Sequence, residues 1–299
     1  MSTVELLVDA RCTTGESPVW DVSGQSLWWV DIPAGRLYRL SVNDDVVSSW
    51  EAPQMLGCIA RSGQTWVAGA ESGLFRLTPH QDGTLDFLPI ASVSHPHPGM
   101  RFNDGRCDRQ GRLWAGTMLL DMSKAAAVGG FYRYDFNDAP DVQTVGAPVL
   151  DGLIVPNGLA FSPDGRTMYL SDSHPLVQTV WAFDYDIETG MPSNRRVFVD
   201  MKALPGRPDG AAIDVDGCYW ICGNDDGCVH RFTPDGKLDR TITLPVLKPA
   251  MCAFGGADMS TLFITSIRPE GDVSKQPLAG GVFAVRPGTS GLPEADCLG

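Results

Sequence analysis

The sequence predicts an all-β fold, a six-bladed β-propeller, from three observations. Long helical periodicity is nearly absent, and short runs rich in Trp, Tyr, Val and Ile alternate with Gly, Pro and Asp turns, a pattern typical of all-β proteins. A turn followed by an aromatic-rich strand then recurs six times along the 299 residues. Repeats of this size, each holding several strands, indicate a propeller whose sheets pack around a central axis.

The six copies are separated by 39 to 54 residues, and each predicts the inner part of one blade. In chain order they are SGQSLWWVD from residue 23, SGQTWVAGA from 62, QGRLWAGTM from 110, DGRTMYLSD from 164, DGCYWICGN from 216 and MSTLFITS from 259. The next strand of each blade is predicted at GRLYRL, GLFRLT, GGFYRYDF, TVWAFDY, GCVHRF and GGVFAV. Residues 5–8 should form a strand that joins the last blade and closes the ring, which removes an exposed edge. No internal linker interrupts the repeats, so we expect residues 1–299 to form one domain.

Oxygen-bearing side chains recur eight residues before four of these turns. They are Glu16, Asn103, Asn157 and Asp209, while the other two blades carry Met55 and Met251. The first strand of a propeller blade lines the channel, so these positions should form a ring around the axis. Carboxylates and amides that converge would repel or stay unsatisfied without a cation or a hydrogen-bonding group. Because such oxygens suit Ca²⁺, Mg²⁺ or Mn²⁺, we expect a divalent ion there; the alternative is a set of polar caps on a water-filled channel.

The loops that follow the second strands should overlook this ring. They span residues 118–130, 171–178, 224–227 and 266–276, and they offer Asp121, Asp172, His174, Asn224 and Asp225 as pocket groups. We expect His174 to lie over the site, and the loop that carries Asp121 to act as a short lid. Arg101, two residues before Asn103, should point to the same side of its strand.

Bulk properties exclude several classes of partner. The formal net charge of −13 argues against nucleic acid, whose binding depends on clustered Lys and Arg. The first residues, MSTVELLVDARC, lack the basic region of a signal peptide, and no apolar run approaches the roughly 18 residues of a membrane span. The eight scattered cysteines favour small buried hydrophobes over a disulfide framework. We therefore expect a cytoplasmic protein with a small-molecule partner; the oligomeric state stays open.

Five segments resemble the regucalcin/SMP-30/gluconolactonase family across about Gly15 to Val285: GESPVW, RFNDG, PNGLAFSPDGRTMYLSDS, RPDGAAID and PLAGGVFAV. The resemblance implies a six-bladed propeller with one divalent metal ion, which could be Ca²⁺, Zn²⁺, Mn²⁺, Mg²⁺ or Fe²⁺, and hydrolysis of aldonolactones. It also implies site residues, namely Glu16, Asn157 and Asp209 as metal ligands, Asn103 near metal and substrate, and Arg101 on the substrate. Asp121 falls where regucalcin-like members have a Glu that contacts sugar hydroxyls, and this shorter acid leaves the exact lactone open.

The function we expect is a metal-dependent lactonase that opens a gluconolactone-, xylonolactone- or arabinonolactone-type substrate to its aldonic acid. Three protein ligands leave coordination positions for water and a substrate oxygen, as catalytic metal sites require. Asp209 is the candidate general base, although metal coordination weakens a carboxylate as a base. Two alternatives stay open: a regucalcin-like calcium-binding regulatory protein without essential catalysis, and an interaction propeller in which the polar channel is incidental.

Overall fold

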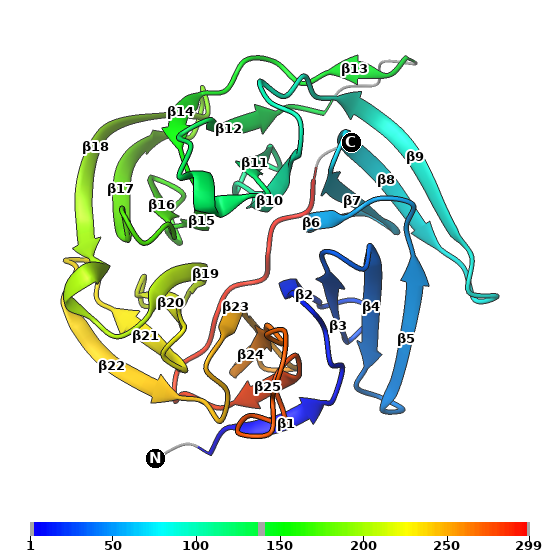
Figure 1. The fold of residues 1–299 in the computed structure, drawn as a ribbon, viewed down its shortest axis with the longest axis vertical. Coiled ribbons are helices and arrows are strands. Elements are labelled where there is room, and N and C mark those ends of the chain that lie inside the picture. Colours follow the sequence, from blue (N-terminus) through cyan, green and yellow to red (C-terminus); the bar gives the residue numbers. More distant parts are fainter. Residues whose placement is uncertain (1–2, 137–140, 298–299) are drawn as a thin grey trace.

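A computed structural model describes residues 3–136 and 141–297, and it confirms the six-bladed β-propeller (Figure 1). Six small sheets surround a central axis, and within each blade the four main strands run antiparallel to their neighbours. Each predicted turn joins the first and second strands of one blade, because alternating apolar residues on both sides of a Gly-containing turn favour a hairpin.

The blades follow one another along the chain. Blade 1 holds β2 (Gly15–Asp21), β3 (Ser26–Asp31), β4 (Arg36–Ser41) and β5 (Val46–Glu51); blade 2 holds β6 (Leu56–Ser62), β7 (Thr65–Ala70), β8 (Gly73–Pro79) and β9 (Leu85–Ser92), with the short β13 (Gln143–Thr144) parallel to β9. Blade 3 holds β10 (Met100–Cys107), β11 (Leu113–Leu119), β12 (Gly129–Tyr134) and β14 (Leu150–Leu153). Blade 4 holds β15 (Pro156–Phe161), β16 (Thr167–Asp172), β17 (Thr179–Asp186) and β18 (Met191–Asp200). Blade 5 holds β19 (Arg207–Ile213), β20 (Tyr219–Asn224), β21 (Cys228–Phe232) and β22 (Leu238–Thr243).

Blade 6 joins the first strand of the chain to the last three strands, as expected. It holds β23 (Pro249–Gly255), β24 (Thr261–Ser266) and β25 (Val282–Val285), and the N-terminal β1 (Glu5–Val8) pairs antiparallel with β25. This pairing satisfies the backbone groups of an edge that would otherwise stay open. Two 3₁₀ helices, η1 (Met122–Lys124) and η2 (Met201–Ala203), complete the described elements, and in the described part of the chain no helix has the length and apolarity to cross a membrane.

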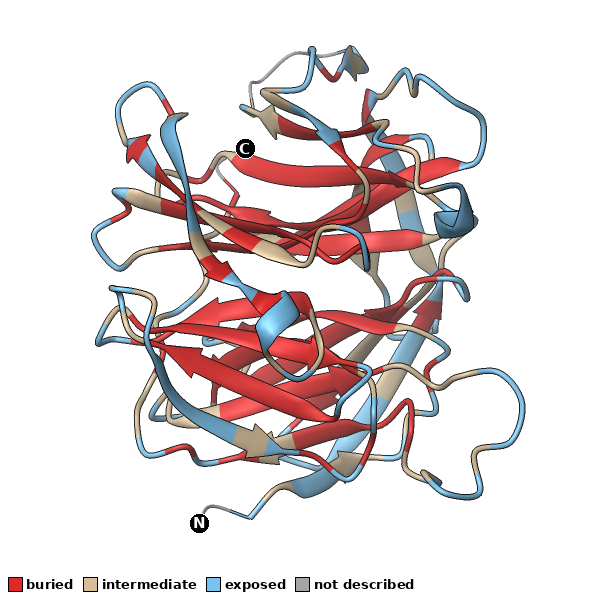
Figure 2. Cartoon of the chain, turned by 60° about the vertical axis from the view of Figure 1, so that its left-hand side comes forward, coloured by how far each residue is buried: buried red, intermediate tan, exposed pale blue. Residues whose placement is uncertain are grey.

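The core lies between the inner strands of neighbouring blades. Figure 2 shows these strands buried, whereas the outer strands and the loops are largely exposed. Trp29, Trp114 and Trp220 occupy the second strands of blades 1, 3 and 5 and are fully buried. The indole N–H of Trp114 donates to the Tyr185 hydroxyl at 2.9 Å, across the boundary between blades 3 and 4. These repeated tryptophans therefore belong to the blade core. All eight cysteines are free and buried.

The segment after β25 crosses the hairpin-turn end of the channel (Figure 1). Its backbone bonds to the inner hairpins of blades 5, 6 and 2, since Ser290 accepts from Val215, Gly291 donates to Met259, and Cys297 donates to the Arg61 carbonyl. Arg106 of β10 also donates to the Glu294 carboxylate at 2.9 Å. The polar positions of the sequence lie at the opposite ends of the inner strands, so the approach to them is from the other face.

Candidate active site

A β-bulge interrupts the inner hairpin of every blade at the level of the polar ring. In each blade the first strand has one residue more than its partner between consecutive pairs. The breaks fall at Glu16/Val19, Leu56/Cys58, Phe102/Gly105, Asn157/Ala160, Pro208/Ala211 and Pro249/Cys252. Bulges bend a strand and re-aim its side chains, and they are frequent beside active sites. The bulge in each of the six blades interrupts the regular alternation of side chains at the start of the inner strand.

The four oxygen-bearing residues all lie at these bulges and are buried, with exposed fractions of 5% to 8%. Their registers differ slightly. Glu16 and Asn157 each pair with a residue of the second strand, and the next paired residue of their own strand comes three positions later. Asn103 and Asp209 lie inside the bulge, two positions before the next paired residue. The eight-residue count from the turns therefore finds the bulge, but it does not find one equivalent position in all blades, because the hairpin registers differ by one residue.

Hydrogen bonds join these residues across blades 3, 4 and 5. Asn103 Nδ2 donates to Asn157 Oδ1 at 2.9 Å and to the Pro156 carbonyl at 3.0 Å. Asn157 Nδ2 donates to Ser173 Oγ at 2.7 Å, and the Ser173 hydroxyl donates to the carbonyl of Pro208, next to Asp209. Because the side-chain oxygen and nitrogen of Asn157 both have partners, its rotamer is fixed. Oδ1 can still accept a second bond.

Burial dominates the electrostatics of the two ring carboxylates. Burial raises the pKa of Glu16 well above its usual range, and the charges of Asp209 and Asp104 raise it further. Burial likewise raises the pKa of Asp209 to about 7, although the nearby Arg207 guanidinium lowers it. Two buried carboxylates that sense each other's charge destabilise each other's ionised form. A cation between them would remove that penalty.

The donor chemistry fits a hard divalent ion. Glu16 Oε2 accepts from the Ser17 backbone N–H at 3.1 Å, and Asp209 Oδ2 accepts from Asn224 at 2.6 Å. The second oxygen of each carboxylate has no hydrogen-bond partner among the described residues, so Glu16, Asn157 and Asp209 can each direct one oxygen to an ion. Two carboxylates and an amide match the oxygen preference of Ca²⁺, Mg²⁺ and Mn²⁺ better than the nitrogen and sulfur preference of Zn²⁺. In the described ranges no cluster of three His, Cys, Asp or Glu side chains offers a competing site.

Arg101 lies beside this set with unused hydrogen-bonding capacity. Its Nη1 donates to Asn103 Oδ1 at 2.7 Å, so the two side chains share a side of β10 as expected, and to the Phe102 carbonyl at 2.8 Å. Its Nε is buried and has no partner within the described chain. Burial lowers the Arg101 pKa to about 10, and the charge of Glu16 opposes that change. The side chain stays cationic at neutral pH and can donate to an oxygen-rich ligand.

The two loop residues predicted for substrate contact have other partners in this structure. Asp121 is half exposed; it accepts from Ser123 Oγ at 2.5 Å and pairs with Lys124 Nζ at 3.5 Å. The hydrogen bond from Ser123 is the main cause that lowers the pKa of Asp121. His174 is buried; its Nδ1 accepts from the Leu176 N–H and its Nε2 lies 3.3 Å from the Met122 carbonyl. His174 thus ties the loop after β16 to η1, and within the described ranges neither Asp121 nor His174 forms a hydrogen bond to a ring residue.

Three other residues have roles that sequence spacing did not distinguish. Asp172 accepts from the backbone N–H groups of residues 154, 155 and 174, so it braces the loop before β15 rather than the pocket. Asp225 pairs with Arg207 and Lys248. Asn224, by contrast, donates directly to Asp209.

Asp104 is a buried acid that the ring count missed. Its Oδ2 accepts from the Leu159 N–H at 2.9 Å, and its Oδ1 has no partner among the described residues. Burial raises the Asp104 pKa, whereas the Arg106 charge lowers it. The only sequence signal was its position directly after Asn103.

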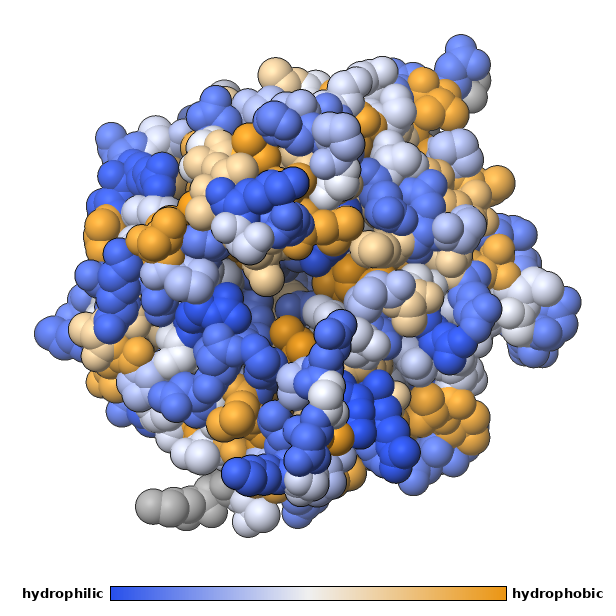
Figure 3. Space-filling model, in the orientation of Figure 1, coloured by the Kyte–Doolittle hydropathy of each residue, from blue (hydrophilic) through white to orange (hydrophobic). Residues whose placement is uncertain are grey.

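The view of Figure 3 shows the molecule hollowed near the centre of the ring of blades, with both hydrophilic and hydrophobic residues around the hollow. A recess of this kind suits a small molecule better than a macromolecule.

Comparison with known proteins agrees with this architecture. The chain is 38% identical over 298 residues to a 6-deoxy-6-sulfogluconolactonase of Pseudomonas putida, which covers 98% of this chain and 97% of that protein. It is 36% identical to regucalcin of Danio rerio, with 97% and 96% covered. A crystal structure of a calcium-binding regucalcin from Agrobacterium tumefaciens superposes with a TM-score of 0.89 at 26% identity, covering 99% and 98% of the two chains.

A gluconolactonase structure from Xanthomonas campestris is similar at a TM-score of 0.69 and 25% identity, with 95% of this chain and 89% of that chain covered. The model of the SMP-30/Gluconolactonase/LRE-like region matches residues 14–268. Matching this model over most of its length and sharing more than a third of its residues with full-length relatives, the chain belongs to the SMP-30/gluconolactonase/LRE-like family.

Proposed function

We propose that this protein is a metal-dependent sugar lactonase that hydrolyses an aldonolactone to its aldonic acid. The observation that carries the proposal is the pair of buried, mutually repelling carboxylates, Glu16 and Asp209, beside an arginine with an unused buried donor. An interaction propeller has no need for such a costly arrangement. The relatives named gluconolactonase and sulfogluconolactonase support the same class of reaction.

In this proposal Glu16, Asn157 and Asp209 hold the ion. A divalent cation held there supplies Lewis-acid activation of a carbonyl group. Arg101 donates to the ring or carbonyl oxygen of the lactone, and Asn103 orients Arg101 through the 2.7 Å bond to its Oδ1. Both groups act before the chemical step, because a substrate held in one orientation reacts faster than one that tumbles.

The reaction needs one proton acceptor. Asp209 is the proposed acceptor, because a carboxylate beside a bound cation would be ionised at neutral pH and able to take up a proton, although coordination weakens it as a base. Asp209 takes a proton from the attacking water, the water oxygen bonds to the lactone carbonyl carbon, and the ring C–O bond breaks. The proton then passes to the departing ring oxygen, which becomes the hydroxyl of the aldonic acid.

The experiment is a lactonase assay after chelation, with separate add-back of Ca²⁺, Mg²⁺, Mn²⁺, Zn²⁺ and Fe²⁺. The substrates are the gluconic, xylonic and arabinonic lactones, with 6-deoxy-6-sulfogluconolactone added because a relative carries that name. Asp209→Ala should lower kcat/KM by more than about tenfold, a loss of 1.4 kcal/mol or more in barrier terms. The matched control is Asp184→Ala, since Asp184 is an exposed acid on β17.

Two results would count against the proposal. If Asp209→Ala retains more than about a tenth of the wild-type kcat/KM, Asp209 has no place in the mechanism. If Ca²⁺ raises the melting temperature while no lactone is hydrolysed with any metal, the regucalcin-like calcium-binding function is the better description.

A further inference from the structure

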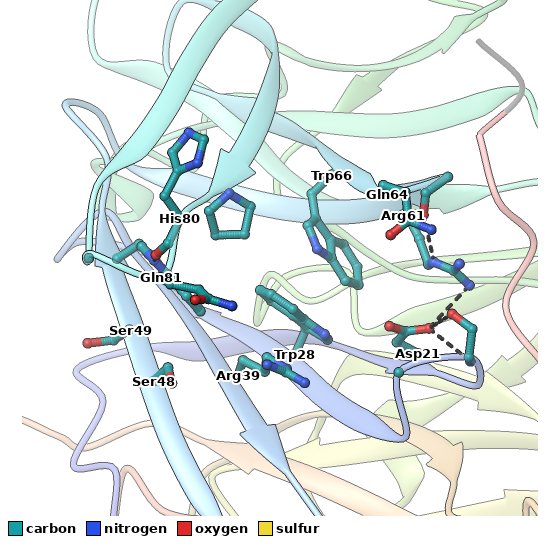
Figure 4. Close-up of a pocket in the computed structure, with 16 residues that line it drawn as sticks. Asp21, Trp28, Arg39, Ser48, Ser49, Arg61, Gln64, Trp66, His80 and Gln81 are labelled. Atoms are coloured by element: carbon teal, nitrogen blue, oxygen red, sulfur yellow. Dashed lines mark hydrogen bonds and ion pairs between the residues drawn. The ribbon is translucent and has the colours of Figure 1, made fainter.

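A pocket of about 690 Å³ lies between blades 1 and 2, away from the ring of oxygen donors (Figure 4). Blade 1 contributes residues of β3, β4 and β5, and blade 2 contributes β7 and the connection from β8 to β9. The pocket reaches Asp21 at the far end of β2, five residues beyond Glu16. At about 3.3 Å per residue the two ends are roughly 17 Å apart, so this pocket and the candidate active site are separate.

Three indole rings form the inner wall of the pocket. Trp28 stacks on Trp50 with ring centroids 5.5 Å apart and meets Trp66 at 4.8 Å. The N–H of Trp28 donates to Ser26 Oγ at 3.0 Å, and that of Trp50 donates to the His80 carbonyl at 2.8 Å. Both donors are therefore satisfied within the protein. The wall offers carbon surface to a ligand, but only the ring edges, because the three side chains are at most 8% exposed.

The pocket carries one positive charge that no acid neutralises. Arg39 of β4 lies over Trp28, with Cζ 5.7 Å from the ring centroid. Its Nε is buried without a partner, and its guanidinium makes no ion pair within the described chain. Its charge contributes only weakly to lowering the pKa of the fully exposed Asp44. The other arginine of the pocket, Arg61, pairs with Asp21 at 3.2 Å. In a chain with a net charge of −13, an uncompensated guanidinium favours an anionic ligand.

The pocket also contains polar side chains that make no hydrogen bond with other residues in the described part of the chain. Ser48 of β5 pairs with Arg39 across the strands and contributes a hydroxyl on the same face. Gln81 contributes an amide next to Arg39, and Gln64 contributes one beside Arg61. Figure 4 shows Gln81 and Arg39 beside the Trp28 ring, with the Arg61–Asp21 pair on the other side. Hydroxyls and amides can both donate and accept, which is the chemistry that recognises several hydroxyl groups at once.

We propose that this pocket binds a sugar acid, a polyhydroxylated molecule with one carboxylate. Arg39 receives the carboxylate through paired N–H donors, Ser48 and the glutamines bond the hydroxyls, and the edge of Trp28 contacts the C–H face. A neutral sugar leaves the guanidinium unpaired. An aromatic acid leaves the hydroxyl and amide groups unpaired and finds no open ring face for stacking. The inference does not rest on the proposed lactonase activity, since the pocket contains none of the ring residues.

Isothermal titration calorimetry with D-gluconate as the probe tests the proposal on the full chain. D-glucose supplies the hydroxyls without the charge, and benzoate supplies the charge without the hydroxyls. Arg39→Gln should weaken gluconate binding at least about tenfold. The matched control is Arg195→Gln, because Arg195 also lies over an indole, 3.8 Å from the Trp181 centroid, but outside the pocket. Glu16→Gln tests whether gluconate binds in this pocket or at the ring of oxygen donors.

The expected pattern is gluconate binding that survives Arg195→Gln and Glu16→Gln, fails in Arg39→Gln, and exceeds the binding of glucose and benzoate. Equal binding by wild type and Arg39→Gln would overturn the site. Loss of binding in Glu16→Gln would assign the gluconate to the ring instead. Benzoate binding as tight as gluconate, or no gluconate binding at millimolar concentration, would overturn the ligand class.

Discussion

Asn224→Ala should impair lactone hydrolysis although Asn224 is not one of the proposed ligands. Asn224 Nδ2 donates to Asp209 Oδ2 at 2.6 Å, and both side chains are buried. No other described side chain bonds to this carboxylate, so the amide alone holds Asp209 in its orientation. Asn224 also donates to the Pro249 carbonyl at 3.3 Å, which links blades 5 and 6.

The size of the effect follows from the chemistry of that bond. A hydrogen bond to a charged group contributes about 1.5–3 kcal/mol, so kcat/KM should fall about 10- to 150-fold. The midpoint of metal-induced stabilisation should move to higher metal concentration in the same variant, because Asp209 is also a proposed ligand. The assay combines steady-state kinetics on gluconolactone with melting temperature against metal concentration.

Asn194→Gly is the matched control, since Asn194 donates to Asp184 at 2.8 Å on an exposed outer strand. It should leave both kcat/KM and the metal midpoint unchanged. If Asn224→Ala loses less than about threefold in kcat/KM, or loses activity with an unchanged metal midpoint, the reasoning that Asn224 acts by positioning Asp209 is wrong.

Three further predictions concern the substrate arginine, a buried core bond and pH. Arg101→Ala should lower kcat/KM more than about tenfold at unchanged metal affinity, whereas the exposed Asp121→Ala should cost less than about threefold; equal losses would mean that the loop closes over substrate. Tyr185→Phe removes the 2.6 Å bond to Asp108 and leaves the Trp114 N–H unpaired, so about 3 kcal/mol or about 5 °C in Tm should be lost by calorimetry, against no change for Tyr134→Phe. In chelator-treated protein, burial raises the pKa of Asp209 from 3.8 to about 7 and that of Glu16 above 4.5. The folded state therefore keeps these protons to higher pH than the unfolded state, and the stability present below about pH 4 should be lost as pH rises towards and above 7. A Tm that rises over this range would contradict the assignment of these carboxylates.

The sequence by itself determined the fold and placed the proposed ligands at the starts of the inner strands. The recurring turn and aromatic strand predicted six blades, and the N-terminal strand was correctly expected to close the last one. Such features are local, because hairpin turns and alternating apolar residues depend on neighbours a few positions apart. The phase of Glu16, Asn157 and Asp209 also follows from a local count, since each lies at the start of the inner strand of its blade.

Only the tertiary structure decided how these side chains are oriented and what supports them. The bulges, the bond from Asn224 to Asp209, the role of His174 as a tie to η1, and the Arg106–Glu294 pair depend on packing between blades or loops. Arg106 and Glu294 are 188 residues apart in the chain, so no local pattern could associate them. The turn and strand pattern of each blade depends on residues that are close together in the sequence. Contacts between blades arise only after the ring has closed and fixed their registers.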